Sequence, residues 1–215
     1  MVRVKICGIT NEKDLKNSII AGADALGFVI DVNSSPRSIS IDRARELMEK
    51  VPVFISKVAV TVLDDFDQII KIKNRLKPEY IQIHGDFDFD DDYMLKALYD
   101  MRMIRAITLK SNLSLESVLN EAENFDAILV DSYKEGKYGG TGMVNDFRIC
   151  REIREAIRPK PLILAGGLNP DNVEEAIRRV KPFAVDVSSG VESSPGIKDY
   201  EKMSNFVASA KRVKN

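Results

Sequence analysis

The sequence predicts an α/β fold, a single (β/α)8 barrel, from three observations. Short, mostly apolar runs rich in β-branched residues recur without strict alternation, which is typical of parallel strands buried on both faces. Amphipathic helical stripes separate these runs, and each stripe can cover one face of a sheet. Eight strand–helix units follow one another, most of them about 23 residues apart. A doubly wound sheet is the alternative that this alternation leaves open.

The expected strands lie between turn residues along the whole chain. They are expected at Val2–Ile6, Ala25–Ile30, Lys57–Val62, Tyr80–Ile83, Met103–Leu109, Ala127–Val130, Pro161–Leu164 and Phe183–Val187. Two of the steps between strands are about ten residues longer than the rest, and the extra residues follow strands, at 31–40 and 131–145. Because this barrel builds its active sites from the loops that follow strands, the two long loops indicate where a substrate is held.

Helix signals stand between the strands. Residues 10–13 open the first helix, and Asn169 before Pro170 is the expected start of the seventh. Apolar residues with helical spacing form three sets: Ala44, Leu47, Met48 and Val51; Leu115, Val118, Leu119 and Ala122; Val173, Ala176, Ile177 and Val180. We expect the acidic run at 86–92 to be a solvated first turn of the fourth helix, with a metal site as the alternative.

Composition narrows the class of protein. No stretch rich in Pro, Gly and Ser divides the 215 residues, so we expect one domain spanning 1–215. With 32 basic and 33 acidic residues the net charge is −1, which disfavours a nucleic-acid-binding domain. The longest charge-free run, about ten residues, is too short to span a membrane. Two cysteines are too few for a disulfide framework and fit a reducing cytoplasm. Together with the one histidine they are too few for a classical zinc site.

Two residues at strand ends are candidates for acid–base chemistry. Cys7 ends the first strand, where a thiolate can act as base or nucleophile, and a small buried core residue is the alternative. Asp131 follows the sixth strand, where burial would raise its pKa and suit it to general-acid work, and a helix or loop cap is the alternative. One base and one acid across the barrel mouth indicate proton transfer.

Cys150, on an apolar stripe with Ile153 and Ile157, is expected to pack in the core.

Glycine-containing turns follow the seventh and eighth strands. The seventh strand runs into Gly166 and Gly167, and the eighth runs through Asp186 into Ser189 and Gly190. Glycine lets the backbone approach a ligand closely, and free N–H groups at a helix start bind phosphate. Because this barrel often binds phosphate between these two loops, a phosphorylated small molecule is the expected ligand.

Further candidate residues lie around the same end of the predicted barrel. Arg37, in the first long loop, has a planar fork that matches a carboxylate, with a solvated surface arginine as the alternative. His84 ends the fourth strand, where it either hydrogen-bonds the substrate or completes the rim. Gly140 lies in the glycine-rich run 138–142 of the second long loop, which suits a hinged lid or a plain surface loop. With Asp186, these three residues are the expected substrate contacts.

Together these segments resemble the phosphoribosylanthranilate isomerase family. The matching pieces are KICGIT at 5–10, GADALGFV at 22–29, SPRSIS at 35–40, IQIHGD at 81–86, ILVDS at 128–132, YGGTG at 138–142, LAGGLNPDNV at 164–173 and VDVSSGVESSPGIKD at 185–199. The sequence departs from the family at 60–62, where relatives often carry Gly and Phe, and in the unusually acidic segment 86–92.

The resemblance implies a TIM barrel that performs a step of tryptophan biosynthesis without a metal or organic cofactor. The reaction is the Amadori rearrangement of N-(5′-phosphoribosyl)anthranilate to 1-(2-carboxyphenylamino)-1-deoxy-D-ribulose 5-phosphate. The resemblance assigns Cys7 as general base on the C2′ proton and Asp131 as general acid on the furanose oxygen. It pairs Arg37 with the anthranilate carboxylate, and it assigns the phosphate to Gly166, Gly167, Ser189 and Gly190. Monomer and homodimer both stay open.

Two rival functions compete with this interpretation. A barrel isomerase of the histidine-pathway type performs the same rearrangement on a larger bisphosphate, but that family uses an aspartate where Cys7 stands. A non-catalytic phosphosugar-binding barrel is disfavoured because Cys7 and Asp131 are both present. An activity assay separates these possibilities.

Overall fold

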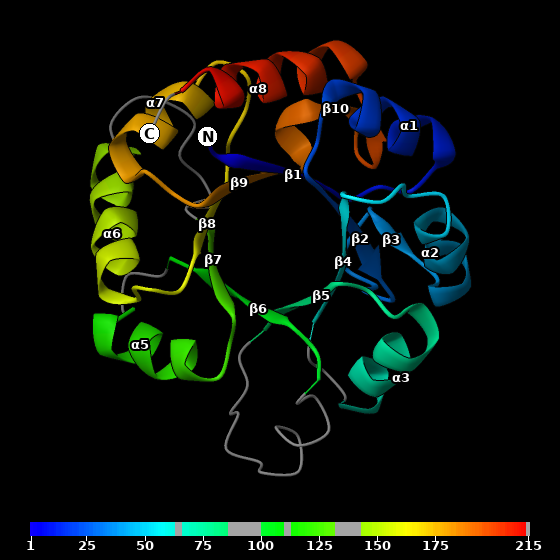
Figure 1. Cartoon of the computed structure of the whole chain (residues 1–215), viewed down its shortest axis with the longest axis horizontal. Coiled ribbons are helices and arrows are strands. Elements are labelled where there is room, and N and C mark those ends of the chain that lie inside the picture. Colours follow the sequence, from blue (N-terminus) through cyan, green and yellow to red (C-terminus); the bar gives the residue numbers. More distant parts are fainter. Residues whose placement is uncertain (63–65, 86–99, 110–112, 132–142, 214–215) are drawn as a thin grey trace.

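The strands form a closed ring with helices around it (Figure 1). The computed structural model describes residues 1–62, 66–85, 100–109, 113–131 and 143–213 of the chain. The strand order is β1-β9-β8-β7-β6-β5-β4-β2, and the pairing of β1 with β2 closes the ring. All pairings in the ring are parallel, so the carboxyl ends of the strands meet at one end of the barrel. The predicted (β/α)8 barrel is therefore confirmed, and the doubly wound sheet is excluded.

The strands of the ring match the predicted segments to within one residue at each end. They are β1 (Arg3–Cys7), β2 (Ala25–Ile30), β4 (Ser56–Val62), β5 (Tyr80–His84), β6 (Met103–Thr108), β7 (Ala127–Asp131), β8 (Leu162–Ala165) and β9 (Ala184–Val187). The helices of the described residues are α1 (Glu12–Ala21), α2 (Ile41–Met48), α3 (Phe66–Leu76), α5 (Leu115–Glu123), α6 (Met143–Ala156), α7 (Val173–Val180) and α8 (Tyr200–Arg212). The acidic run 86–92 lies outside the described residues.

Two details of the predicted helices are wrong, and both have a local cause. The seventh helix starts at Val173, because the Asn169 side chain accepts hydrogen bonds from the backbone N–H groups of Asp171 and Asn172 and so holds a separate turn before it. On α5 only part of the expected stripe is buried, since Leu115 and Leu119 are 45% and 37% exposed. The start of α1 is as predicted, with the Asn11 side chain accepting from the backbone N–H of Asp14.

The hydrophobic core has two layers, one outside the strand ring and one inside it. Alternate strand residues, such as Val4 and Ile6 of β1, pack outward beneath the helices. The inner layer is smaller, and it includes Cys7 and Leu129. Cys150 of α6 is fully buried in the outer layer, as predicted. The inner layer shares the barrel interior with buried polar side chains, which is where a site can form.

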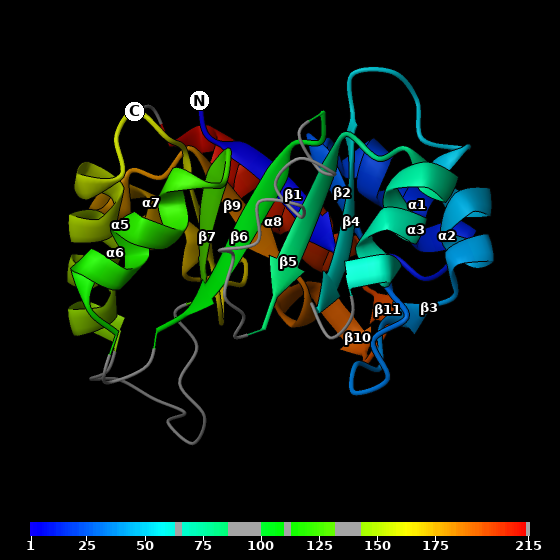
Figure 2. The same cartoon turned by 90° about the horizontal axis from the view of Figure 1, so that it is seen from below.

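Three short strands stand beside the carboxyl ends of the ring. β3 (Ser38–Ile39) pairs with β2, while β10 (Glu192–Ser194) and β11 (Ile197–Lys198) form a hairpin after η1 (Ser189–Val191). Figure 2 shows β3, β10 and β11 together at the end toward which the strand arrows point. This hairpin brings two charged side chains, Glu192 and Lys198, to the barrel mouth. No helix of the described residues is long and apolar enough to span a membrane.

Candidate active site

A cavity of about 460 Å³ opens at the carboxyl ends of the strands. Its walls come from the ends of β1, β2, β4, β5, β7, β8 and β9 and, among the described residues, from the loops after β2, β8 and β9. The lining includes nine of the ten predicted site residues: Cys7, Arg37, His84, Asp131, Gly166, Gly167, Asp186, Ser189 and Gly190. The tenth, Gly140, lies outside the described residues. Residues far apart in the sequence thus converge on one cavity.

Cys7 reaches this cavity from the last position of β1. Its partner across the β1–β2 pairing is Gly27, and a Cβ atom at Gly27 would lie 2.7 Å from the Cys7 sulfur. Glycine at that position therefore makes room for the thiol inside the barrel. Burial raises the pKa of the Cys7 thiol, and the positive charge of Lys5 opposes that rise.

Asp131 reaches the same cavity from the last position of β7. Around the ring, β7 is three strands away from β1, so the carboxyl and the thiol enter from different sides. The Asp131 side chain is only partly buried. The structure thus brings together the one base candidate and the one acid candidate that the sequence singled out, with a cavity between their strands.

A polar network that the sequence analysis missed lies beneath Cys7. The Lys5 Nζ is 3.0 Å from the Asp186 Oδ2 and donates to the Gln82 Oε1 over 2.8 Å. The other carboxylate oxygen of Asp186, Oδ1, is buried without a hydrogen-bond partner among the described residues. Because an unsatisfied buried acceptor is costly, this oxygen is suited to a ligand hydroxyl or N–H group. The sequence did contain a signal for this network, because Lys5 is a charged residue inside a strand that the sequence predicts to be buried.

The same network fixes the charge state of His84. The Gln82 carbonyl oxygen faces Lys5, so its amide nitrogen is the atom 2.8 Å from the His84 Nε2, and that ring nitrogen must accept. Burial lowers the pKa of His84 to about 4, with smaller contributions from the charges of Lys5 and Arg105. His84 is therefore a neutral imidazole at the cavity wall, which offers hydrogen bonding rather than charge.

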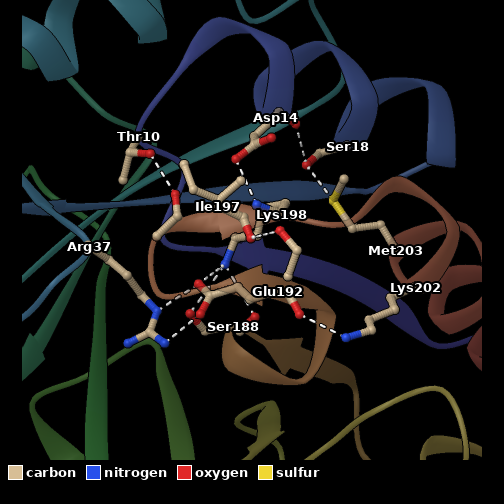
Figure 3. A network of polar contacts seen from close by, with 12 residues as sticks. Thr10, Asp14, Ser18, Arg37, Ser188, Glu192, Ile197, Lys198, Lys202 and Met203 are labelled. Atoms are coloured by element: carbon tan, nitrogen blue, oxygen red, sulfur yellow. Dashed lines mark hydrogen bonds and ion pairs between the residues drawn. The ribbon is translucent and has the colours of Figure 1, made fainter.

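Arg37 enters the cavity from the loop after β2, and Glu192 holds its guanidinium (Figure 3). The Arg37 Nε donates to one Glu192 oxygen over 2.8 Å and one Nη donates to the other over 2.6 Å. The predicted partner of Arg37 was a ligand carboxylate, yet two of its three nitrogens are used by the protein. The remaining Nη does not take part in this pairing. Glu192 thus orients the guanidinium before any ligand binds.

Glu192 is itself part of a buried ion network. Its Oε1 also accepts from Lys198 Nζ over 2.8 Å, and the Lys198 side chain is fully buried (Figure 3). Burial would raise the pKa of Glu192, but the hydrogen bonds from Arg37 and Lys198 outweigh it and lower that pKa. Lys198 also donates to the Ser188 carbonyl oxygen over 3.2 Å, which ties the network to the loop after β9. The sequence analysis gave no role to Glu192 or Lys198, although both lie in the segment 185–199 that resembles the family.

The two glycine turns lie against each other at the cavity wall. A Cβ atom at Gly190 would lie 1.9 Å from the Leu168 carbonyl oxygen, so the loops after β8 and β9 are in direct contact. Gly167 has a φ of +64°, and a Cβ there would meet nothing within 4 Å. The side of Gly167 on which a side chain would stand is therefore open. Among the described residues, no three His, Cys, Asp or Glu side chains gather as a metal site.

Comparison with known proteins agrees with this arrangement. A family model described as N-(5'phosphoribosyl)anthranilate (PRA) isomerase matches residues 4–209. The curated N-(5'-phosphoribosyl)anthranilate isomerase of Haloferax volcanii is 41% identical over 215 residues, covering 100% of this chain and 95% of the relative. The enzyme of the same name from Methanothrix thermoacetophila is 41% identical over 207 residues, covering 96% and 97%.

Solved structures give the same result. The phosphoribosyl anthranilate isomerase of Thermotoga maritima superimposes with a TM-score of 0.85 at 39% identity, over 99% of this chain and 100% of that chain. A phosphoribosyl anthranilate isomerase in complex with reduced 1-(o-carboxyphenylamino)-1-deoxyribulose 5-phosphate superimposes with a TM-score of 0.84 at 37% identity, with the same coverage. The chain belongs to the N-(5'-phosphoribosyl)anthranilate isomerase family.

Proposed function

We propose that this chain, as one barrel domain spanning 1–215, isomerises N-(5'-phosphoribosyl)anthranilate to 1-(2-carboxyphenylamino)-1-deoxy-D-ribulose 5-phosphate. Family membership supports the reaction. The observation that carries the proposal is the single cavity whose lining includes Cys7, Asp131, Arg37 and the two glycine turns. That set offers a base, an acid, a carboxylate receptor and a phosphate receptor, which are the groups that this substrate needs.

The proposed chemistry moves protons only. Asp131 donates a proton to the furanose ring oxygen, the C1′–O bond breaks, and a protonated Schiff base forms between C1′ and the anthranilate nitrogen. The Cys7 thiolate then removes the C2′ proton, and the C2′–H electron pair forms the C1′–C2′ double bond of an enolamine. Tautomerisation of this enolamine, with protonation at C1′, gives the ketone. C1′ is reduced and C2′ is oxidised within one molecule, so no external oxidant, reductant or metal is required.

The remaining predicted residues bind the substrate in this proposal. The Arg37 Nη that does not contact Glu192 binds the anthranilate carboxylate, while Glu192 keeps the guanidinium in place. The phosphate binds at the contact of the two glycine turns, to backbone N–H groups of Gly166, Gly167, Ser189 and Gly190. His84 and the Asp186 Oδ1, which has no hydrogen-bond partner within the described part of the chain, bind sugar hydroxyl groups. Gly140 would act from the loop after β7.

A fluorescence progress curve tests the reaction. Phosphoribosylanthranilate is generated in situ from anthranilate and phosphoribosyl pyrophosphate with the appropriate transferase, and purified protein is added with a chelator. We expect a rapid fall of the anthranilate-type fluorescence that the chelator does not slow. If a folded protein produces no fall, the function is wrong, and the bisphosphate substrate of the histidine-pathway type is tested next.

We further propose that the chain is a homodimer that associates through the amino-terminal end of the barrel. The loop between α2 and β4 stands out beyond that end (Figure 2). At its tip Val53 is 81% exposed and Phe54 is 100% exposed, and Phe54 has a φ of +70°. A cavity of about 580 Å³ lies at the same end of the barrel, and its lining includes Val58, Ile104 and Ile163. The same lining also carries charged residues: Arg3, Lys5, Asp24, Arg102 and Asp126.

A second copy explains both features, because an exposed apolar tip can contact the apolar part of an open cavity on the same face of its partner. The isomerase of Thermotoga maritima is described as dimeric. Light scattering after gel filtration tests the assembly: we expect a dimer mass for the wild type and a monomer mass for Phe54→Glu. Glu46→Lys, on the exposed face of α2, is the control that should leave the mass unchanged. A monomeric wild type would contradict the proposal.

Both cysteines are free thiols, which supports a reducing compartment such as the cytoplasm as the place of function. Cell fractionation of the native producer tests this location.

A further inference from the structure

Lys5 occupies an unusual place for a lysine. It lies in the middle of β1, only 3% exposed, with its side chain inside the barrel. Its ammonium is 3.0 Å from the Asp186 carboxylate and hydrogen-bonds the Gln82 side chain over 2.8 Å. Burying an ammonium group costs free energy even when it is paired, and a salt bridge of this kind often adds no net stability. The position therefore calls for a functional explanation.

Cys7 is the neighbour of Lys5 on the interior face of the same strand. Residues two apart on a strand point to the same side. Both side chains approach the place where Gly27 has no Cβ: an atom there would lie 2.7 Å from the Cys7 sulfur and 3.1 Å from the Lys5 Cε. Gly27 thus makes a shared niche in which the thiol and the lysine side chain lie together.

The groups around this niche come from several elements. On β9, Asp186 pairs with Lys5, and on β5, His84 is neutral. From the hairpin and the loop after β2 come Lys198, Glu192 and Arg37, which form one network. Asp131 lines the far side of the cavity. The two ion networks together hold three cations and two carboxylates, so their positive charge exceeds their negative charge by one: Lys5, Lys198, Arg37, Asp186 and Glu192.

We propose that Lys5 is a positioning residue that stabilises the thiolate form of Cys7, and that Asp186 holds Lys5 in place while opposing its effect on the thiol. The inference rests on the proposed function, in which Cys7 must be a thiolate to accept the C2′ proton. A thiolate would neutralise the single excess positive charge of the two networks. Lys5 does not touch the substrate in this proposal; it acts through Cys7.

The pKa directions are consistent with this geometry. Burial raises the pKa of Cys7, Lys5 lowers it through its charge and a hydrogen bond, and the charge of Asp186 raises it. Burial would lower the pKa of Lys5, but Asp186 and Cys7 outweigh burial and raise it, so Lys5 stays charged while the thiol titrates. Removing Lys5 should therefore make the thiol a weaker acid, and neutralising Asp186 should make it a stronger one.

The test is the pH dependence of Cys7 alkylation by iodoacetamide, followed by mass spectrometry of the peptide that contains Cys7. Only the thiolate reacts, so the midpoint of the rate profile reports thiol ionisation without any isomerase substrate. Lys5→Met should move the midpoint upward, so that alkylation at pH 8 slows at least about tenfold, since a contacting opposite charge shifts a pKa by one unit or more. Asp186→Asn should move it downward and speed alkylation at the same pH.

Matched variants keep the test decisive. Lys57→Met removes a lysine that pairs with Glu79 on another part of the barrel, and it should leave the midpoint unchanged. If Lys5→Met does not fold because it leaves Asp186 buried without its cation, Lys5→Met/Asp186→Asn is compared with Asp186→Asn alone. The double variant should then have the higher midpoint. Circular dichroism and thermal unfolding establish that each variant is folded.

Two outcomes would overturn the proposal: an unchanged midpoint in folded Lys5 variants, or a downward shift on removing Lys5. The pH profile of kcat/KM separates this from the proposed function, because its acidic limb should move with the alkylation midpoint. If the midpoint moves and the limb does not, Lys5 does tune the thiol, but Cys7 is not the base of the reaction.

Discussion

The two ends of the barrel both contain a cavity, yet they differ in how their polar groups are satisfied. The cavity at the amino-terminal end, about 580 Å³, is larger than the one at the carboxyl-terminal end, about 460 Å³. At the amino-terminal end the carboxylates complete the sheet: Asp24 accepts from the Val4 backbone N–H over 2.9 Å, and Asp126 accepts from the Met103 backbone N–H over 2.7 Å. These two carboxylates therefore have a structural role.

Toward the carboxyl-terminal end, Asp186 and Glu192 each pair with a buried lysine instead. Asp186 contacts Lys5 and keeps one oxygen without a partner among the described residues, while Glu192 orients Arg37. Cavity volume alone would have selected the amino-terminal end, where the cavity lining includes none of the predicted site residues. The difference teaches that an unsatisfied buried polar group and a candidate acid and base lining one cavity distinguish a candidate active site better than cavity size does.

The largest expected effect comes from removing the acid or the base. Cys7→Ala and Asp131→Asn should each lower kcat by at least about a hundredfold, because one positioned general acid or base contributes roughly 10²–10⁴. The fluorescence progress curve measures kcat, and circular dichroism reports folding. Cys150→Ala, at a packed core cysteine on α6, is the control that should keep kcat. Turnover at the wild-type rate in folded Cys7→Ala or Asp131→Asn would refute that residue's role.

The contact between the glycine turns gives the next effect. A Cβ at Gly190 would lie 1.9 Å from the Leu168 carbonyl, so Gly190→Ala must push the two loops apart. We expect a loss of about a hundredfold in kcat/KM, mostly through KM, because displacing a binding loop by about an ångström is enough for this. Gly167→Ala is the matched comparison: open space surrounds its Cβ, so it carries only the cost of a positive φ.

Steady-state kinetics on both glycine variants test whether the contact between the two loops matters for phosphate binding. Gly190→Ala should lose more than Gly167→Ala, and equal losses would mean that loop contact is unimportant for phosphate binding.

Glu192→Gln should have a smaller effect on catalysis. The amide can still accept one hydrogen bond from Arg37 but lacks the charge, so we expect KM to rise by about tenfold or less with little change in kcat. Steady-state kinetics with varied substrate separate the two constants. A kcat loss at unchanged KM would show that Arg37 does not serve ground-state binding.

The same variant has a signature in the pH dependence of stability. The folded pKa of Glu192 is lowered, so its ionised form stabilises the fold above the unfolded value of about 4.3, and this contribution is lost as the pH falls through the lowered folded value. Urea unfolding should therefore show the wild type more stable than Glu192→Gln at pH 7, with the difference shrinking below about pH 4.3. A difference that does not depend on pH would contradict this.

The smallest catalytic effect is expected at the other end of the barrel. Asp24→Asn weakens the hydrogen bond to Val4 and the ion pair with Lys211 at 3.3 Å, so the free energy of unfolding should fall by about 1–2 kcal/mol. Because Asp24 lies at the opposite end from the site, kcat and KM should stay at wild-type values. A change in kcat or KM would contradict the view that the amino-terminal end supports stability and the carboxyl-terminal end supports catalysis.

The eight strands were predictable because a strand buried on both faces needs a continuous apolar run, and that requirement is local. The predicted buried stripe of α5 was only partly correct, because Leu115 and Leu119 are apolar but exposed. Which side of an amphipathic helix is covered depends on the neighbours that pack against it.

The candidate site divides in the same way. Cys7 and Asp131 were recognisable because each stands at the end of an apolar run, and the strand-end positions of this barrel are where its sites lie. Lys5 could have been noticed as a charge inside a buried strand. Glu192 could not, because its importance comes from Arg37, 155 positions earlier in the chain.

The sequence by itself determined the order of strands and helices, and it predicted which end of the barrel holds the candidate site and its candidate acid and base. These follow from local patterning and from a closed parallel ring. Only the tertiary structure decided which charges meet: Lys5 with Asp186, and Arg37 with Glu192 and Lys198. Electrostatic pairing depends on distances of a few ångströms between distant segments, and such distances exist only once the ring has closed.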